Sequence, residues 1–290
     1  MYKAKKNYEI AGEKVQQIEA SYITAQNKFK AGLIAEVEAL QLEIDLASGR
    51  NDLLTAERTL GETKNDFIIL IGLNLSDIID VVAQLEYKPI DVDLDQAIGE
   101  AIANRTELKD AEADISLRRL SVDEIDSQGE ISGLLSANYG VNKDNNKIQN
   151  IFNDLDASRS VTMTLKVPVL DWGKNKRNVE SAEADLSLYK LSYENQKKEI
   201  QNEIITVVNS LNSAKARVET LAKSVELAQK SYDISVARFQ SGTITSFDLQ
   251  QMQLRLTDAK INSLNALIDY KIALADLSRK TLHDFDKQEN

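Results

Sequence analysis

The chain has 290 residues, a net charge of −11 and no cysteine. This acidic balance argues against a nucleic-acid-binding protein, which needs a basic face, and the lack of cysteine excludes disulfides and thiolate chemistry. With 42% hydrophobic residues but only two prolines and eleven glycines, the composition predicts long, uninterrupted helices. The first residues, MYKAKKNYEIAGEKVQQIEA, lack the apolar core of a signal peptide. The longest apolar run, FIILIGL at 67–73, is shorter than the roughly 20 residues that a membrane-spanning helix needs.

An internal repeat organises the chain. KFKAGLIAEVEALQ at 28–41 aligns with RFQSGTITSFDLQQ at 238–251, so that Gly32 matches Gly242 at an offset of 210 (242 − 32). The same register holds from Val15 and Val225 to Ala56 and Ala266 without a gap. We therefore expect two copies of one unit, each a helix, a glycine-bearing turn and a second helix.

The longest helix is expected over 173–239. Its apolar residues recur in alternating steps of three and four with a single stutter, which is typical of a heptad seam. At about 1.5 Å per residue this helix would be roughly 100 Å long, so it must lie along a partner. Periodicity alone fits a soluble scaffold of helical hairpins equally well.

The segment between the two copies changes its pattern. Residues 94–127 have helical periodicity with a bend at 104–106, and 130–141 and 160–169 alternate apolar and polar side chains with period two. In the second stretch one face holds the apolar residues Val161, Met163, Leu165 and Val167. A hairpin of a membrane β-barrel and a soluble sheet with one buried face both predict this alternation.

The second strand is expected to end at Pro168, which has no N–H to donate. Asp171 is a candidate cap for the long helix, and Gly173 follows Trp172 where strand becomes helix. Trp172 fits either a membrane interface, where tryptophan concentrates, or a plug between sheet and helix.

Four stretches resemble the TolC family of outer-membrane efflux proteins. VPVLDWGKNKRNVESAEADL resembles the family's strand-to-helix joint, and ARFQSGTITSFDLQQMQLRLTDAK and FKAGLIAEVEAL resemble its second-repeat and first-repeat turns. AIANRTELKDAEADISL resembles the helix ahead of the second β-hairpin, with Thr106 where the family often has proline.

The resemblance implies a mainly α fold. Long coiled-coil helical hairpins would form an α-barrel tunnel, and one β-hairpin would contribute to a trimeric membrane β-barrel. Because a complete protomer has a β-hairpin in each repeat, the resemblance also implies an N-terminally truncated protomer. The expected parts are a first-repeat helical hairpin at 1–75 with its tip at 30–35, a connector and helix at 76–128, the barrel hairpin at 129–170, a second-repeat helical hairpin at 171–283 with its tip at 240–245, and a tail at 284–290.

The two turns have a further role by resemblance. In the family they form the periplasmic tip that meets an adaptor protein, and through it an inner-membrane pump. The expected docking residues are Gly32, Leu33, Ile34, Gly242, Thr243 and Ile244. Exposed aliphatic residues at the tip would suit docking, whereas packed ones would only staple the turns.

A pore constriction near the tip is also implied by resemblance. Asp248 falls on an acidic position of the family, Glu38 is its repeat partner, and Gln251 stands where a second acid is common. A ring of three Asp248 carboxylates would attract cations and raise its own pKa by like-charge repulsion. Otherwise Asp248 is an ordinary solvated acid.

Nothing in the sequence indicates an enzyme. No nucleophile–base, metal-ligand or phosphate-loop spacing is present, and no cofactor is expected. The interpretation favoured is a homotrimeric outer-membrane channel component with its helices in the periplasm, serving a tripartite efflux or type I secretion system. Such a channel is a passive conduit in contact with outer-membrane lipid. The alternative is a soluble coiled-coil scaffold with no membrane role.

Overall fold

The structure, a computed structural model, describes all residues except 78, 81–85, 143–155 and 286–290. The chain forms two compact units. One comprises residues 1–101 and 203–290, and the other comprises residues 102–202. Helix α5 (Lys174–Ser241) belongs to the second unit at its beginning and to the first at its end.

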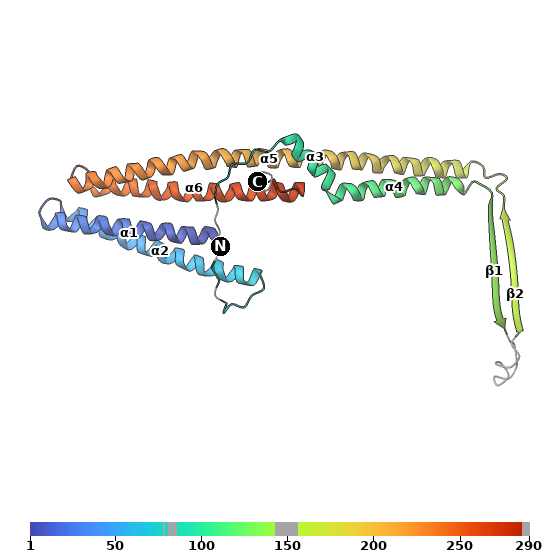
Figure 1. The fold of residues 1–290 in the computed structure, drawn as a ribbon, viewed down its shortest axis with the longest axis horizontal. Helices are drawn as coiled ribbons and strands as arrows, with labels where there is room; N and C mark the ends of the chain where they lie inside the picture. Colours follow the sequence, from blue (N-terminus) through green and yellow to red (C-terminus); the bar gives the residue numbers. More distant parts are fainter. Residues whose placement is uncertain (78, 81–85, 143–155, 286–290) are drawn as a thin grey trace, which may run out of the picture. The chain divides into compact units, whose positions relative to one another are not determined.

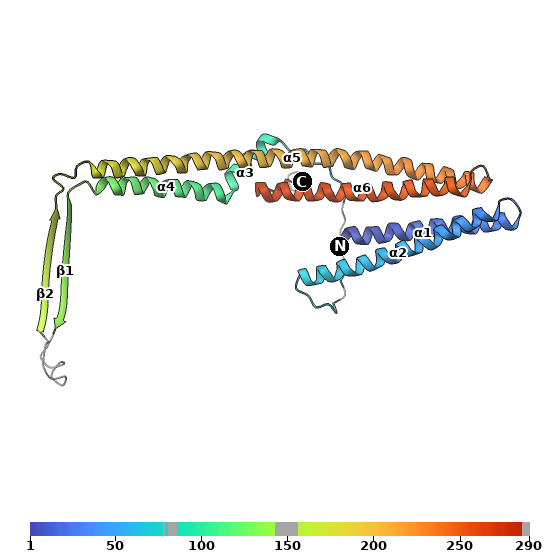
Figure 2. The same ribbon diagram turned by 180° about the vertical axis from the view of Figure 1, so that it is seen from behind.

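The first unit is built from two antiparallel helical hairpins. Helices α1 (Tyr2–Lys30) and α2 (Glu36–Leu70) form one, and the end of α5 forms the other with α6 (Ser246–Thr281) (Figures 1 and 2). Helices α2 and α6 begin 210 residues apart (246 − 36), in agreement with the repeat. Near the turns the two hairpins share one apolar core, formed by Ala25, Ala39, Leu42, Tyr232, Phe239, Leu249 and Leu256.

A tyrosine fixes the connector against the second hairpin. Tyr270 on α6 is fully buried, donates its hydroxyl to the Lys88 carbonyl at 2.8 Å, and accepts the Ile90 N–H at 3.2 Å. The Tyr87 ring meets the Tyr270 ring edge-on at 5.3 Å. These hydrogen bonds pair the backbone groups on either side of Pro89, in a segment that belongs to no helix or strand. The connector continues into α3 (Leu94–Asn104).

The second unit carries the sheet. Helix α4 (Thr106–Ser127) follows a break at Arg105, where the sequence predicted a bend, and its Arg118 and Glu112 bond Tyr189 and Tyr193 of α5, each at 2.8 Å. Strands β1 (Ser132–Asn142) and β2 (Asp156–Lys166) pair antiparallel, with Leu135 opposite Met163.

The second strand lies earlier in the chain than its alternation predicted. It ends at Lys166, so Val167 and Pro168 lie beyond the ladder, and the prediction that Val167 belongs to the strand is wrong. Proline has no N–H and also restricts the residue before it, so pairing stops two residues short of Pro168. At its other end the strand begins at Asp156, before the alternating stretch starts.

Candidate functional site

The two turns share one backbone geometry. Gly32 and Gly242 have φ values of +72° and +80°, the left-handed region that glycine enters without strain. Each donates its N–H to the carbonyl of the phenylalanine three residues earlier, and the next residue donates to the carbonyl five residues back. This pair of bonds is the Schellman motif, which ends a helix by satisfying its last carbonyls.

The residues predicted to dock an adaptor differ in how exposed their side chains are. Leu33 is 72% exposed and Thr243 is also exposed, as expected for the tip. Ile34 and Ile244 are instead half-buried, because both pack against the shared core. The predicted exposure of these two isoleucines is wrong, and their side chains instead hold the turns against the core. The exposed apolar surface of the tips is completed by Val37 and Phe247, which no sequence pattern selected.

The first turn contacts both helix ends of the second. Lys28 donates to the Phe239 carbonyl, and its ammonium lies 4.8 Å from the centre of the Phe239 ring. Glu38 accepts the Ser246 N–H, the first of α6, at 3.5 Å. The cation thus sits at the C-terminal end of α5 and the anion at the N-terminal end of α6, where each complements the helix dipole.

Asp248 caps its own helix. Its carboxylate accepts the Thr245 N–H at 3.1 Å and the Thr245 hydroxyl at 2.8 Å, and Thr245 in return accepts the Asp248 N–H. These bonds hold the pKa of Asp248 below its usual value. In the single chain the shift is therefore opposite to the one expected for a ring of acids. Asp248 is exposed, and Gln251 and Glu38 are half-buried.

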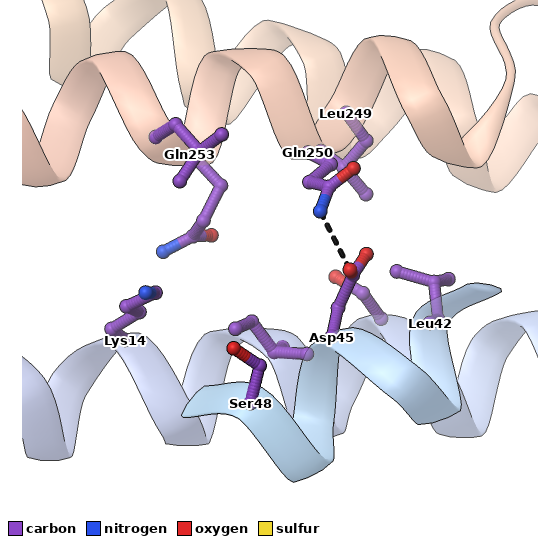
Figure 3. A pocket seen from close by; sticks show the side chains of 10 residues that line it. Lys14, Leu42, Asp45, Ser48, Leu249, Gln250 and Gln253 are labelled. Atoms are coloured by element: carbon purple, nitrogen blue, oxygen red, sulfur yellow. Dashed lines mark hydrogen bonds between the residues drawn. The ribbon is translucent and has the colours of Figure 1, made fainter. Parts of the chain in front are cut away.

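A cavity of about 90 Å³ lies where α6 crosses the groove between α1 and α2 (Figure 3). Asp45 of α2 accepts from Gln250 of α6 at 2.6 Å and from Gln41 at 3.1 Å, both through Oδ1. Its Oδ2 is buried without a hydrogen-bond partner among the described residues, and burial raises the pKa of Asp45. Lys14 lines the same cavity and pairs with Asp52 at 2.9 Å.

The chain matches the family model described as outer membrane efflux protein over residues 97–281. It belongs to this family. A curated relative, nodulation protein T of Rhizobium leguminosarum bv. trifolii, is 24% identical over 254 residues. The match covers 84% of this chain and 52% of the relative, so the chain spans about half the relative's length.

Solved structures of other proteins have the same fold as this chain. A membrane protein from Pseudomonas aeruginosa superposes with a TM-score of 0.73 at 18% identity, covering 96% of this chain and 64% of that one. The Campylobacter jejuni CmeC outer membrane channel gives 0.69 at 16% identity, covering 100% of this chain and 61% of that one. The predicted family and fold class are confirmed, and the family places the protein at the outer membrane.

The apolar face of the efflux-family hairpin is clearly defined. Cross-strand partners Ala137 and Val161, Leu135 and Met163, and Gly133 and Leu165 share one face. The opposite face carries hydroxyl-bearing residues such as Ser136, Thr162 and Thr164, with Leu134 as an exception. The apolar residues are exposed in the single chain, so this hairpin needs further surface to cover it.

The strand-to-helix joint is held by Asp171. Its carboxylate accepts the N–H groups of Gly173 and Asn175, each at 2.9 Å, which confirms the predicted cap and lowers the pKa of Asp171. Trp172 and Gly173 both have positive φ, at 56° and 76°. Trp172 is 86% exposed, so it does not plug the joint within the chain.

Sequence reasoning missed Lys28 and Asp45. Each looks like a solvated charge within a heptad, and their partners lie 211 and 205 residues away.

No helix among the described residues is long and apolar enough to cross a bilayer. Within the same residues, no three acidic, histidine or cysteine side chains gather as metal ligands. The efflux family and its structural neighbours are channel proteins, and the scaffold alternative finds no support among them.

Proposed function

We propose that the protein is a subunit of a homotrimeric outer-membrane channel, a passive conduit in a tripartite efflux or type I secretion system. The hairpin β1–β2 contributes to the membrane barrel, and the helical hairpins line the periplasmic tunnel. Transport through such a conduit is driven by an inner-membrane pump, to which a periplasmic adaptor links it.

The observation that carries this proposal is the division of one chain into two kinds of surface. An antiparallel hairpin presents an exposed apolar face beside an exposed tryptophan, whereas the helical hairpins end in glycine-bearing turns that expose only a few apolar side chains. Lipid is the natural cover for the first surface. The turns, with Leu33, Val37 and Phe247 exposed, offer apolar contacts to an adaptor.

Within this channel, Asp248 and Glu38 form the acidic part of the tip. Asp248 is exposed and its capping bonds favour the charged form, so it stays ionised at neutral pH. Three copies around an axis would select for cations, with Gln251 contributing polar but uncharged surface at the constriction.

Single-channel conductance in planar bilayers tests the proposal. The wild-type protein from outer membranes should conduct with a preference for cations, and Asp248→Asn should reduce that preference. The asparagine keeps an oxygen that accepts from Thr245, so the charge alone is removed. Asp66→Asn, an exposed acid far along α2, serves as the control and should leave selectivity unchanged. A protein that inserts in bilayers but never conducts contradicts the proposed function.

A further inference from the structure

The apolar face of the hairpin β1–β2 ends in a charged side chain. Arg159 of β2 lies opposite Tyr139 of β1 and shares a face with Val161 and Met163, on their side away from the joint. The guanidinium carbon of Arg159 lies 5.6 Å from the centre of the Tyr139 ring. Both side chains are exposed, Tyr139 to 68%. The face assigned to lipid thus carries a cation on an aromatic ring at the end away from the helices.

The guanidinium group of Arg159 is not neutralised by a carboxylate. Within the described part of the chain it makes no ion pair and no hydrogen bond, and the same holds for the Tyr139 hydroxyl. Arg118 of α4 differs, because it lies 4.5 Å from the centre of the Tyr189 ring and also donates to the Tyr189 hydroxyl at 2.8 Å. Arg159 therefore keeps its planar fork of N–H donors, which matches the oxygens of a phosphate.

The position of Arg159 along the strand corresponds to a membrane boundary. Ten residues (169 − 159) separate it from Val169, which is 89% exposed, and the exposed Trp172 follows. An extended chain of that length spans about 33 Å, and at a tilt of about 40° it rises about 25 Å, the height of the apolar band of an outer-membrane barrel. An arginine on the lipid face is strongly destabilising at the midplane but is tolerated near a boundary.

We propose that Arg159 and Tyr139 bind the phosphate of an anionic lipid headgroup at the outer boundary of the membrane. Paired N–H groups of the guanidinium donate to the phosphate oxygens, the Tyr139 hydroxyl donates to a further oxygen, and the ring holds the guanidinium on this face. The acyl chains of the same lipid lie against the exposed Val161 and Met163. Because the whole chain has a net charge of −11, its overall field repels anionic lipid, and the attraction must be local.

Native mass spectrometry of the protein in detergent micelles tests this site. Protein purified from outer membranes is mixed with phosphatidylglycerol, which is anionic, or with phosphatidylcholine, whose headgroup has no net charge. Wild-type protein should retain phosphatidylglycerol at collision energies that remove phosphatidylcholine. Arg159→Gln should bind phosphatidylglycerol about tenfold more weakly, because it loses a charge-assisted pair of hydrogen bonds. Arg159→Lys should be intermediate, since an ammonium lacks the planar fork.

Two controls separate this site from general effects of charge and of free phosphate. Arg118→Gln removes the arginine that contacts a tyrosine ring on the helices instead of on the strand face, and it should bind phosphatidylglycerol as the wild type does. Inorganic phosphate in excess should leave the lipid bound, because the acyl chains supply much of its affinity. Displacement by inorganic phosphate would identify an anion site without a lipid and overturn the proposal.

The inference rests on the membrane barrel of the proposed function, and the outcomes separate the two. A channel that conducts in planar bilayers but retains both lipids equally, or whose Arg159→Gln variant keeps the preference for phosphatidylglycerol, overturns the headgroup site and leaves the channel intact. If Arg159→Gln does not insert, Arg159→Lys decides in its place, and wild-type retention by that variant overturns the paired contact. A protein that never inserts in a membrane contradicts both proposals.

Discussion

Gly32 and Gly242 are the residues on which both chain reversals depend. A Cβ at Gly32 would meet no atom within 4 Å, and one at Gly242 would meet only the Lys28 ammonium at 3.8 Å. Space is therefore available at both positions, and the constraint is the positive φ alone. Any substitution acts on the backbone conformation, which in turn sets the direction of α2 and α6.

We expect Gly242→Ala to lower the free energy of unfolding by about 1 kcal/mol, because a left-handed conformation strains an L-residue. Gly61→Ala is the matched control. Gly61 lies in the interior of α2 with nothing within 4 Å, so alanine should stabilise that helix by about 1 kcal/mol. Urea unfolding followed by circular dichroism measures both. Equal effects of the two substitutions would contradict a special role for the turn.

Asp45 is the residue where pH should act on the packing of the two hairpins. Burial raises its pKa in the folded chain, so the folded state binds the proton more tightly than the unfolded state does. Stability contributed by this group therefore grows as pH falls through the raised pKa, and the penalty of its charge is fully present at neutral pH. The charged group that lines the cavity beside it is Lys14 of α1, which also pairs with Asp52, and α6 presents only amides and leucines to the cavity.

Asp45→Asn should accordingly raise the free energy of unfolding at pH 7 by on the order of 1 kcal/mol, since it removes the charge whose burial is unfavourable at that pH. The gain should vanish below about pH 4, where the aspartate is protonated in both states. Asp52→Asn removes a half-exposed acid that pairs with Lys14 at 2.9 Å and should give no gain at pH 7. A gain from Asp45→Asn that is constant from pH 4 to 7 would rule out titration of this carboxyl.

At the scale of elements, β1 and β2 form a hairpin whose two faces should respond differently to charge. Met163 lies on the apolar face opposite Leu135, and Thr164 lies on the other face opposite Leu134. Under the proposed function the first faces lipid and the second faces the lumen. The two residues are adjacent, so they lie at nearly the same depth along the strand.

Met163→Lys should destabilise the inserted protein by about 2–4 kcal/mol, the range for a lysine on the lipid face near the midplane of a barrel. Thr164→Lys should cost far less, because its side chain enters the aqueous side. The amount of protein that resists urea extraction from outer membranes reports the difference. If both variants extract alike, the assignment of faces is wrong.

The elements also show what sequence patterns can and cannot predict. Glycine after a heptad helix predicted both turns, and period-two alternation predicted both strands, because these are local preferences. The end of β2 was missed because Val167 and Val169 continue the alternation through a proline that cannot pair. The burial of Ile34 and Ile244 depends on the other hairpin lying across them, and no local pattern records that contact.

At the scale of the whole molecule, the repeat predicted more than the fold. It related the two turns, and in the structure it also relates a covered groove to an uncovered one. Asp45 and Arg255 occupy equivalent positions with opposite charges. Helix α6 lies over Asp45 and offers it the amide of Gln250, whereas only α5 and α6 themselves line the groove that holds Arg255. Sequence alone could not assign that difference, because the covering helix had to be placed first.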